Sequence, residues 1–249
     1  MSTVAGAPVE EHRDDTGARM GMWLFLFTEL LLFTGLFLIY AVQRYRFSSD
    51  FAYAAATLDT GIGTLNTAIL LTSSLTMVLA VVALQQGKRK LSVTLMAITL
   101  GAGLAFMINK YFEWSHKFEL GLYPGSEELV LRTPGEQTFY SLYYAMTGLH
   151  GIHVVIGMGV IGTMIYFTAR RPRRVVRLRD VEETALENLG EAGRYAAEGQ
   201  LEEVQITLFY VENEDVTERS VIRVENTGLY WHLVDVIWIF LFPLFYLIG

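Results

Sequence analysis

The sequence predicts an all-α polytopic membrane protein with five transmembrane helices. Hydrophobic residues make up 52% of the 249 residues and charged residues only 18%, and the mean hydropathy is positive at +0.35. The apolar residues gather into five runs of about 20 or more, the length that a helix needs to cross the hydrocarbon core of a bilayer. A soluble globular domain is therefore excluded.

The expected spans cover residues 20–43, 64–84, 91–114, 139–168 and 226–248. They divide the chain into a cytoplasmic tail (1–19), four transmembrane helices (20–168), a polar insertion (169–225) and a fifth transmembrane helix (226–249). The hydrophilic start lacks the basic region and short apolar stretch of a signal peptide, so we expect the first span to be retained.

Lys and Arg are unevenly distributed between the two sides that the spans define. Fourteen lie on the side of the N-terminus, in the tail, in the turn at residues 88–90 and in the 169–225 segment, whereas four lie on the other side. Because cytoplasmic segments carry an excess of basic residues, we expect the N-terminus in the cytoplasm and the C-terminus outside.

The 169–225 segment is long for a connector and holds thirteen of the 26 acidic residues. Its composition favours a helix up to about residue 199. Residues 205–211 and 220–224 alternate β-branched and polar side chains, which is typical of a hairpin. We expect a small cytoplasmic helix-plus-hairpin insertion. It either contacts a cytoplasmic-side partner or is a loop under weak constraint.

The composition also limits the chemistry. Cysteine is absent, which removes disulfides, iron–sulfur clusters and thiolate metal sites. The net charge is −7, so we expect no nucleic-acid partner.

Three of the five histidines fall within spans. His150 and His153 are three residues apart on one helix face but have no carboxylate nearby in their span, and His232 and Asp235 resemble a carboxylate–histidine hydrogen-bonded pair. We therefore expect no metal in this chain and hydrogen-bonded structural histidines, although a haem held between two spans is geometrically possible.

Glu29 lies well inside the first span. An ionised carboxylate is expensive there, so we expect it to face the bundle interior and to hydrogen-bond another helix. It is either a proton-handling or lipid-binding acid or a structural hydrogen-bonding group. Its depth overlaps that of the histidines and of Ser73 and Ser74, so one internal polar cluster could join them all.

A second polar group lies at the far end of the third span. Lys110 and Glu113 are three residues apart and are followed by Trp114, while Tyr230 and Trp231 lie in the fifth span. These types are typical of an interfacial ion pair with aromatic anchors. A lipid-headgroup site is the alternative.

Four segments carry a family resemblance. GMWLFLFTELLLFTGLF, LNTAILLTSSLTM, TGLHGIHVVIG and YWHLVDVIWIFLF resemble the signature segments of subunit III of haem–copper terminal oxidases, that is, cytochrome c oxidase subunit III. Seven-helix members carry two further helices before the first of these segments, so the chain resembles the five-helix variety.

The resemblance implies an accessory subunit with no catalytic residue and no redox centre of its own, in the bacterial inner membrane. It implies packing against catalytic subunit I and subunit II, whose haem and copper reduce dioxygen with either cytochrome c or quinol as donor, and binding of phospholipid. Glu29, His150, His153, His232 and Asp235 match the family's intramembrane polar positions, which implies support of proton uptake or a structural polar cluster.

Two other functions remain open at this point. A subunit-III-like accessory protein of nitric oxide reductases has about the same number of helices. A small proton-coupled transporter could use Glu29 and Asp235 as a proton relay.

Overall fold

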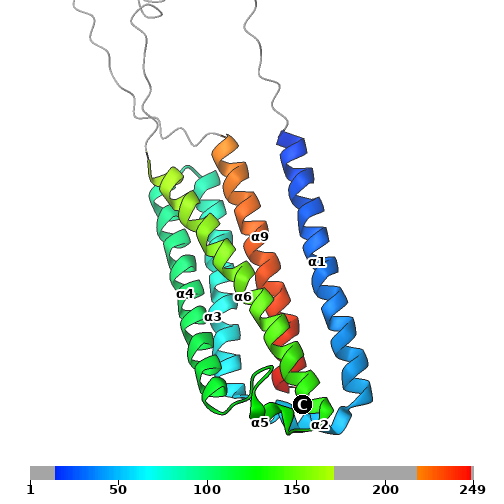
Figure 1. Ribbon diagram of the computed structural model, residues 1–249. Coiled ribbons are helices and arrows are strands. Elements are labelled where there is room, and N and C mark those ends of the chain that lie inside the picture. Colours follow the sequence, from blue (N-terminus) through cyan, green and yellow to red (C-terminus); the bar gives the residue numbers. More distant parts are fainter. Residues whose placement is uncertain (1–14, 171–217, 248–249) are drawn as a thin grey trace, which may run out of the picture. The chain divides into compact units, whose positions relative to one another are not determined.

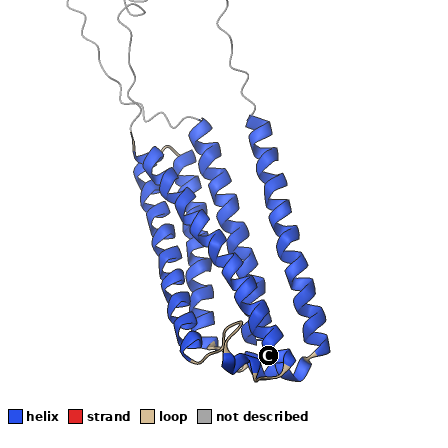
Figure 2. Ribbon diagram, viewed as in Figure 1, coloured by secondary structure: helices blue, strands red, loops and turns tan. Residues whose placement is uncertain are grey.

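The computed structural model describes residues 15–170 and 218–247 (Figure 1). Within these ranges all regular secondary structure is helical (Figure 2). The long helices are α1 (Asp15–Arg46), α3 (Thr60–Gln85), α4 (Arg89–Glu119), α6 (Pro134–Ala169) and α9 (Glu218–Phe242). Each contains a stretch long and apolar enough to cross a membrane, so the five predicted spans are confirmed.

Three short elements were not predicted. They are α2 (Ser48–Ala55), α5 (Glu127–Val130) and the π-helical turn η1 (Pro243–Leu247), which continues α9. The first two lie in connections too short and too mixed in polarity to give a periodic apolar signal. Each long helix also begins before its predicted span.

The predicted strand at residues 220–224 is wrong, because these residues lie in the first turns of α9. Ile222 and Val224 are buried there, and burial against neighbouring helices outweighs the weak preference of β-branched side chains for strands. The predicted helix near residue 199 and the predicted strand at 205–211 lie outside the described residues.

Local signals fix where the helices begin and turn. The Asp59 side chain accepts hydrogen bonds from two backbone amides in the first turn of α3, a standard N-cap. Gly87 takes a φ of 75° between α3 and α4, a conformation that glycine adopts without strain. Pro134 occupies the first position of α6, and Thr133 Oγ1 accepts from the Glu136 amide at 3.3 Å.

The ends of the long helices fall into two groups (Figure 1). The start of α1, the α3–α4 turn, the end of α6 and the start of α9 lie at one end of the bundle. Helices α2 and α5 and the end of α9 lie at the other. This grouping is the one on which the count of basic residues was based. Which end faces the cytoplasm stays a prediction.

Helix α9 forms the centre of the bundle and α1 its edge. In the most apolar 18-residue stretch of the span that contains α9, 56% of the residues are buried. In the corresponding stretch of α1, only 11% are buried. Trp231 and Trp238 of α9 are fully buried. The indole of Trp231 fits against Gly103 and Gly157, where an added Cβ would come within 2.9 Å of it. Small residues therefore let α4 and α6 close around α9.

Gly157→Val should destabilise the bundle, because its Cβ would clash with the buried Trp231 ring. Overpacking of this kind costs about 1–3 kcal/mol, which thermal unfolding of the purified protein will register as a lower midpoint. The matched control is Gly159→Val on the same helix, where an added Cβ meets nothing within 4 Å. Equal midpoints for the two variants would contradict the packing argument.

Candidate functional site

Glu29 and His153 form a hydrogen-bonded pair that joins α1 to α6. The His153 Nε2 to Glu29 Oε2 distance is 2.9 Å, and the two side chains are only 10% and 17% exposed. The expected hydrogen bond from Glu29 to another helix is thus confirmed. Phe33 packs edge-on against the imidazole at 5.4 Å between ring centroids, which keeps the pair in an apolar setting.

The other imidazole nitrogen determines what this pair can do. His153 Nδ1 lies 2.8 Å from the Leu149 carbonyl, and a carbonyl only accepts, so Nδ1 carries a hydrogen. Nε2 then either accepts from a protonated Glu29 or donates to its carboxylate. Both arrangements contain the same number of protons and have zero net charge. The pair can therefore transfer a proton internally without changing the charge inside the membrane.

His232 makes a different contact from the one predicted. Its Nδ1 lies 2.7 Å from the Ser74 hydroxyl of α3, and the predicted His232–Asp235 hydrogen bond is wrong. Ser74 is near the Asp235 carboxylate as well, but neither Asp235 oxygen has a hydrogen-bond partner of acceptable geometry among the described residues. The imidazole turns toward α3 because a hydroxyl is available there at hydrogen-bonding distance.

His150 is fully buried in an aromatic cage. Its ring lies 5.7 Å from Phe106 at 87° and 5.3 Å from Trp238 at 30°, and neither nitrogen has a hydrogen-bond partner in the described parts of the chain. The expectation of hydrogen-bonded histidines holds for His153 and His232 but is wrong for His150. The polar groups also form separate sites rather than the single cluster expected.

Lys110 and Glu113 form an ion pair that is buried inside the bundle. Lys110 Nζ donates to Glu113 Oε2 at 2.9 Å and to the hydroxyls of Tyr143 and Tyr246 at 3.0 and 3.1 Å. Both tyrosines in turn donate to Glu113 Oε1. All three ammonium hydrogens therefore have acceptors, and the cation also lies 5.5 Å from the Trp238 ring centre, which is a favourable cation–π distance.

The aromatic residues predicted as interfacial anchors differ in how deeply they are buried in the bundle. Trp231 is fully buried and donates its indole N–H to Ser73 at 3.0 Å, and the Tyr230 hydroxyl donates to the His153 carbonyl at 3.2 Å. An anchor role for these two is wrong, because their polar atoms bond inside the bundle. Trp114 is only partly buried and lies at the surface between α4 and α6.

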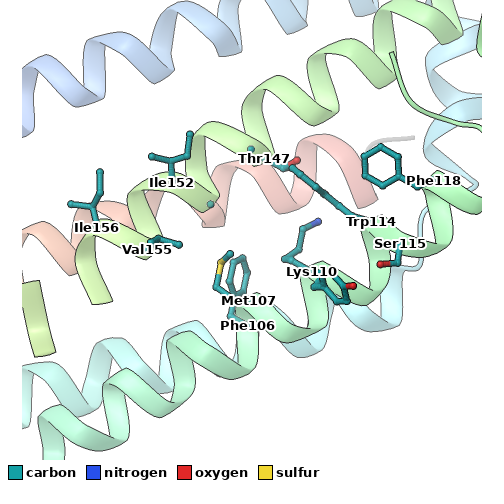
Figure 3. A pocket seen from close by; sticks show the side chains of 13 residues that line it. Phe106, Met107, Lys110, Trp114, Ser115, Phe118, Thr147, Ile152, Val155 and Ile156 are labelled. Carbon is teal, nitrogen blue, oxygen red and sulfur yellow. The ribbon is translucent and has the colours of Figure 1, made fainter. Parts of the chain in front are cut away.

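A groove runs between α4 and α6 beside Trp114 (Figure 3). Its volume is about 540 Å³, and it is lined on α4 by residues from Phe106 to Phe118 and on α6 by residues from Thr147 to Ile156. We refer to it as the α4–α6 groove. The aliphatic stem of Lys110 crosses its floor toward α6 (Figure 3).

Among the described residues, no group of three His, Asp or Glu side chains is close enough together to hold a metal ion. Most polar sites in this part of the chain are pairs and networks that hydrogen-bond internally, and His150 and Asp235 are exceptions.

Comparison with known proteins identifies the family. The sequence model described as "Cytochrome c oxidase subunit III" matches residues 3–171, well over half of the chain. The chain belongs to this family.

Curated relatives extend the similarity over nearly the whole chain. A cytochrome c oxidase subunit 3 of Alkalihalophilus pseudofirmus is 29% identical over 92% of this chain and 86% of its own length. A cytochrome bo(3) ubiquinol oxidase subunit 3 of Pseudomonas putida is 24% identical over 92% and 85%, respectively. A quinol oxidase subunit 3 of Bacillus spizizenii is 26% identical over 98% and 94%. These names favour an oxidase subunit over the nitric oxide reductase and transporter alternatives.

Sequence reasoning missed the tyrosines in this subunit III family member. Tyr143 and Tyr246 supply the hydroxyls of the Lys110–Glu113 network from α6 and η1, yet each lies in an apolar stretch where a tyrosine is also a common packing residue. Depth along the helices was the available signal. Tyr143 lies near the start of α6 and Glu113 near the end of α4, and these two helix ends are at the same end of the bundle.

Glu113→Ala should be strongly destabilising, because it leaves the Lys110 ammonium buried without a counter-charge. Removing one partner of a buried pair costs about 3–5 kcal/mol. Lys110→Met should cost less, since the carboxylate keeps both tyrosine donors.

The measurement is chemical or thermal unfolding of the purified protein, with Glu119→Ala as the control because Glu119 is exposed at the end of the same helix. A Lys110→Met/Glu113→Ala double variant should recover part of the loss. If it is no more stable than Glu113→Ala alone, the unpaired charge is not the cause.

Proposed function

We propose that the chain is the accessory subunit III of a haem–copper terminal oxidase in a bacterial inner membrane, without a catalytic centre of its own. The observation that carries the proposal is the family match over residues 3–171 together with relatives named as oxidase subunit 3 over 92–98% of the chain. In this role it stabilises the subunit that carries haem and copper, where dioxygen is reduced, and binds phospholipid.

The surface of the bundle supports a role in a larger assembly. Helix α1 exposes large apolar side chains along most of its length, and Trp23, Leu24 and Leu38 are each more than 60% exposed. Among the long helices it packs against α6 and α9. We propose that its outer side contacts the catalytic subunit or lipid held between the two subunits. From the charge count, we propose a further cytoplasmic-side contact through the 169–225 segment.

The relatives include both cytochrome c oxidases and quinol oxidases. The proposal therefore covers either donor.

Affinity purification of the tagged chain from its native membranes tests this function. We expect a haem-containing catalytic subunit to co-purify, with a Soret band and dioxygen-reducing activity in the same fractions. A chain that purifies alone, or with a haem-free transporter subunit, would overturn the assignment.

We further propose that the Glu29–His153 pair supports proton uptake by the complex. The pair lies at the α1–α6 contact, is 10–17% exposed and can exchange one proton internally. Such a group can pass protons near the surface of the partner subunit without placing a net charge in the hydrocarbon.

Glu29→Gln separates this role from a structural one. The side-chain amide of that variant would still hydrogen-bond His153 and hold α1 to α6 but would not exchange a proton. If the pair handles protons, Glu29→Gln and Glu29→Ala should both assemble and both lose activity several-fold faster than wild type during sustained turnover. Thr28→Val on the exposed side of α1 is the control. If Glu29→Gln keeps wild-type turnover and proton pumping and only Glu29→Ala loses them, the pair is a structural hydrogen bond and does not handle protons.

A further inference from the structure

We propose that His232 is a docking point for a transmembrane helix of a partner subunit. In this arrangement Asp235 and Ser74 hold the imidazole as an N–H donor that faces out of the bundle. Two features of the structure carry the inference, a buried carboxyl without a partner and an imidazole edge that reaches the surface deep in the membrane. The site is formed by α3 and α9, so it differs from the α1 surface and holds for any membrane assembly that contains the chain.

Asp235 of α9 is buried without an ionic partner. The residue is 2% exposed, and neither carboxyl oxygen has a hydrogen-bond partner among the described residues. A carboxylate in this setting would lose its hydration without compensation, which is very costly in the interior of a membrane. Asp235 is therefore a neutral carboxylic acid, and its side chain carries one O–H donor.

The hydrogen of Asp235 sets the direction of a short hydrogen-bond chain. The Ser74 hydroxyl is near the Asp235 carboxyl and lies 2.7 Å from His232 Nδ1. When the acid donates to Ser74 Oγ, the single hydroxyl hydrogen of Ser74 goes to Nδ1, which accepts it. A neutral imidazole that accepts at Nδ1 carries its own hydrogen at Nε2. The chain thus selects the tautomer in which Nε2 is a donor.

The Nε2 edge of His232 reaches the outer side of the bundle. Both nitrogens of His150 are buried and unpartnered, whereas neither nitrogen of the partly exposed His232 is. Nδ1 bonds Ser74, and Nε2, which has no partner within the described ranges, is accessible from the surface. His232 shares a helix face with Val236 and Phe240, which are 41% and 56% exposed. The donor therefore lies on the membrane-facing side of α9.

This donor lies near the middle of the membrane. Its partner Ser74 is fourteen residues from Thr60 at the start of α3 and eleven residues from Gln85 at its end. At 1.5 Å per residue these separations are about 21 and 16 Å, and the hydrocarbon core is about 30 Å thick. The ester carbonyls and headgroups of lipids lie at the edges of that core, and water does not hydrate polar groups inside it.

At this depth an acceptor has to come from another polypeptide. An N–H group left in hydrocarbon forfeits a hydrogen bond, and acyl chains contain no acceptor. On α3, Val78 lies one turn after Ser74 and is 44% exposed, so apolar side chains flank the donor on both helices. A polar group within an apolar seam is typical of contacts between membrane helices. The occupant is therefore a transmembrane helix that presents an acceptor at mid-depth.

Photo-crosslinking in native membranes tests this contact. Benzoylphenylalanine replaces Val236, one turn from His232, in the full-length chain. We expect one covalent product with a different, membrane-spanning polypeptide. His232→Asn should lower its yield several-fold, because the Asn side chain can still accept from Ser74 but has no donor at the Nε2 position. Thr72→Val is the matched control and should keep the yield, since the exposed Thr72 hydroxyl bonds the Ala68 carbonyl of its own helix.

Equal yields with and without His232→Asn would overturn the proposal, and so would products with phospholipid alone or with a second copy of this chain. A His232-dependent product with a haem-free complex would refute the proposed function and leave this contact standing. If the Val236 variant does not assemble, the complex that carries only His232→Asn is titrated with detergent. It should release one polypeptide at a lower detergent concentration than wild type and Thr72→Val do, and equal release refutes the contact.

The direction of the hydrogen-bond chain has a measurement of its own. Infrared difference spectra of the purified assembly, wild type minus Asp235→Asn, should contain the C=O stretching band of a protonated carboxylic acid, shifted in heavy water. The band should persist when the same difference is taken in a Glu29→Gln background, which removes a different buried carboxyl. A carboxylate band in its place would overturn the proposal, because Ser74 would then donate to Asp235 and the imidazole would no longer present a donor.

Discussion

The ion pair between Lys110 and Glu113 determines how one end of the bundle is built. Hydrocarbon cannot hydrate either charge, so every hydrogen and lone pair that the pair presents must be satisfied by protein. The partners come from three segments, with Tyr143 on α6, Tyr246 on η1 and the pair itself on α4. The same requirement ties the end of α9 to α4, because the Tyr246 hydroxyl on η1 accepts from Lys110 and donates to Glu113.

Two faces of α6 have different roles, and both follow from the periodicity of its sequence. One face carries Tyr143, His150 and His153, which are buried against α4, α9 and α1. Another face carries Gly148 and Gly151, which leave the hollow of the α4–α6 groove. Glycine thus serves opposite purposes on one helix. At Gly157 it lets Trp231 approach the backbone, whereas at Gly151 it leaves space that the bundle does not fill.

The sequence was sufficient for the helices and insufficient for the pairing of their polar groups. Span length and composition are local properties, so all five spans were predicted, and the depth of Glu29 correctly indicated a partner on another helix. The hydrogen-bond partner of each hydroxyl or imidazole depends on how the helices are rotated about their axes. Packing over the whole bundle sets this rotation. His232 therefore bonds Ser74 instead of Asp235, and Trp231 turns inward to Ser73. The wrong strand prediction at residues 220–224 has the same origin. The local preference of this segment was ambiguous, and burial against the helices around α9 made it helical.

The charge balance of the Glu29–His153 pair limits the role it can have in the proposed function. With Nδ1 held by Leu149, the pair shares one mobile proton and is neutral overall in either arrangement. A second proton would give a net positive charge beside Phe33, where no carboxylate other than Glu29 is in contact with the pair among the described residues. Such a state is costly inside the membrane, so the pair would release a proton as it accepts one. It is therefore suited to passing protons along a path and poorly suited to storing them.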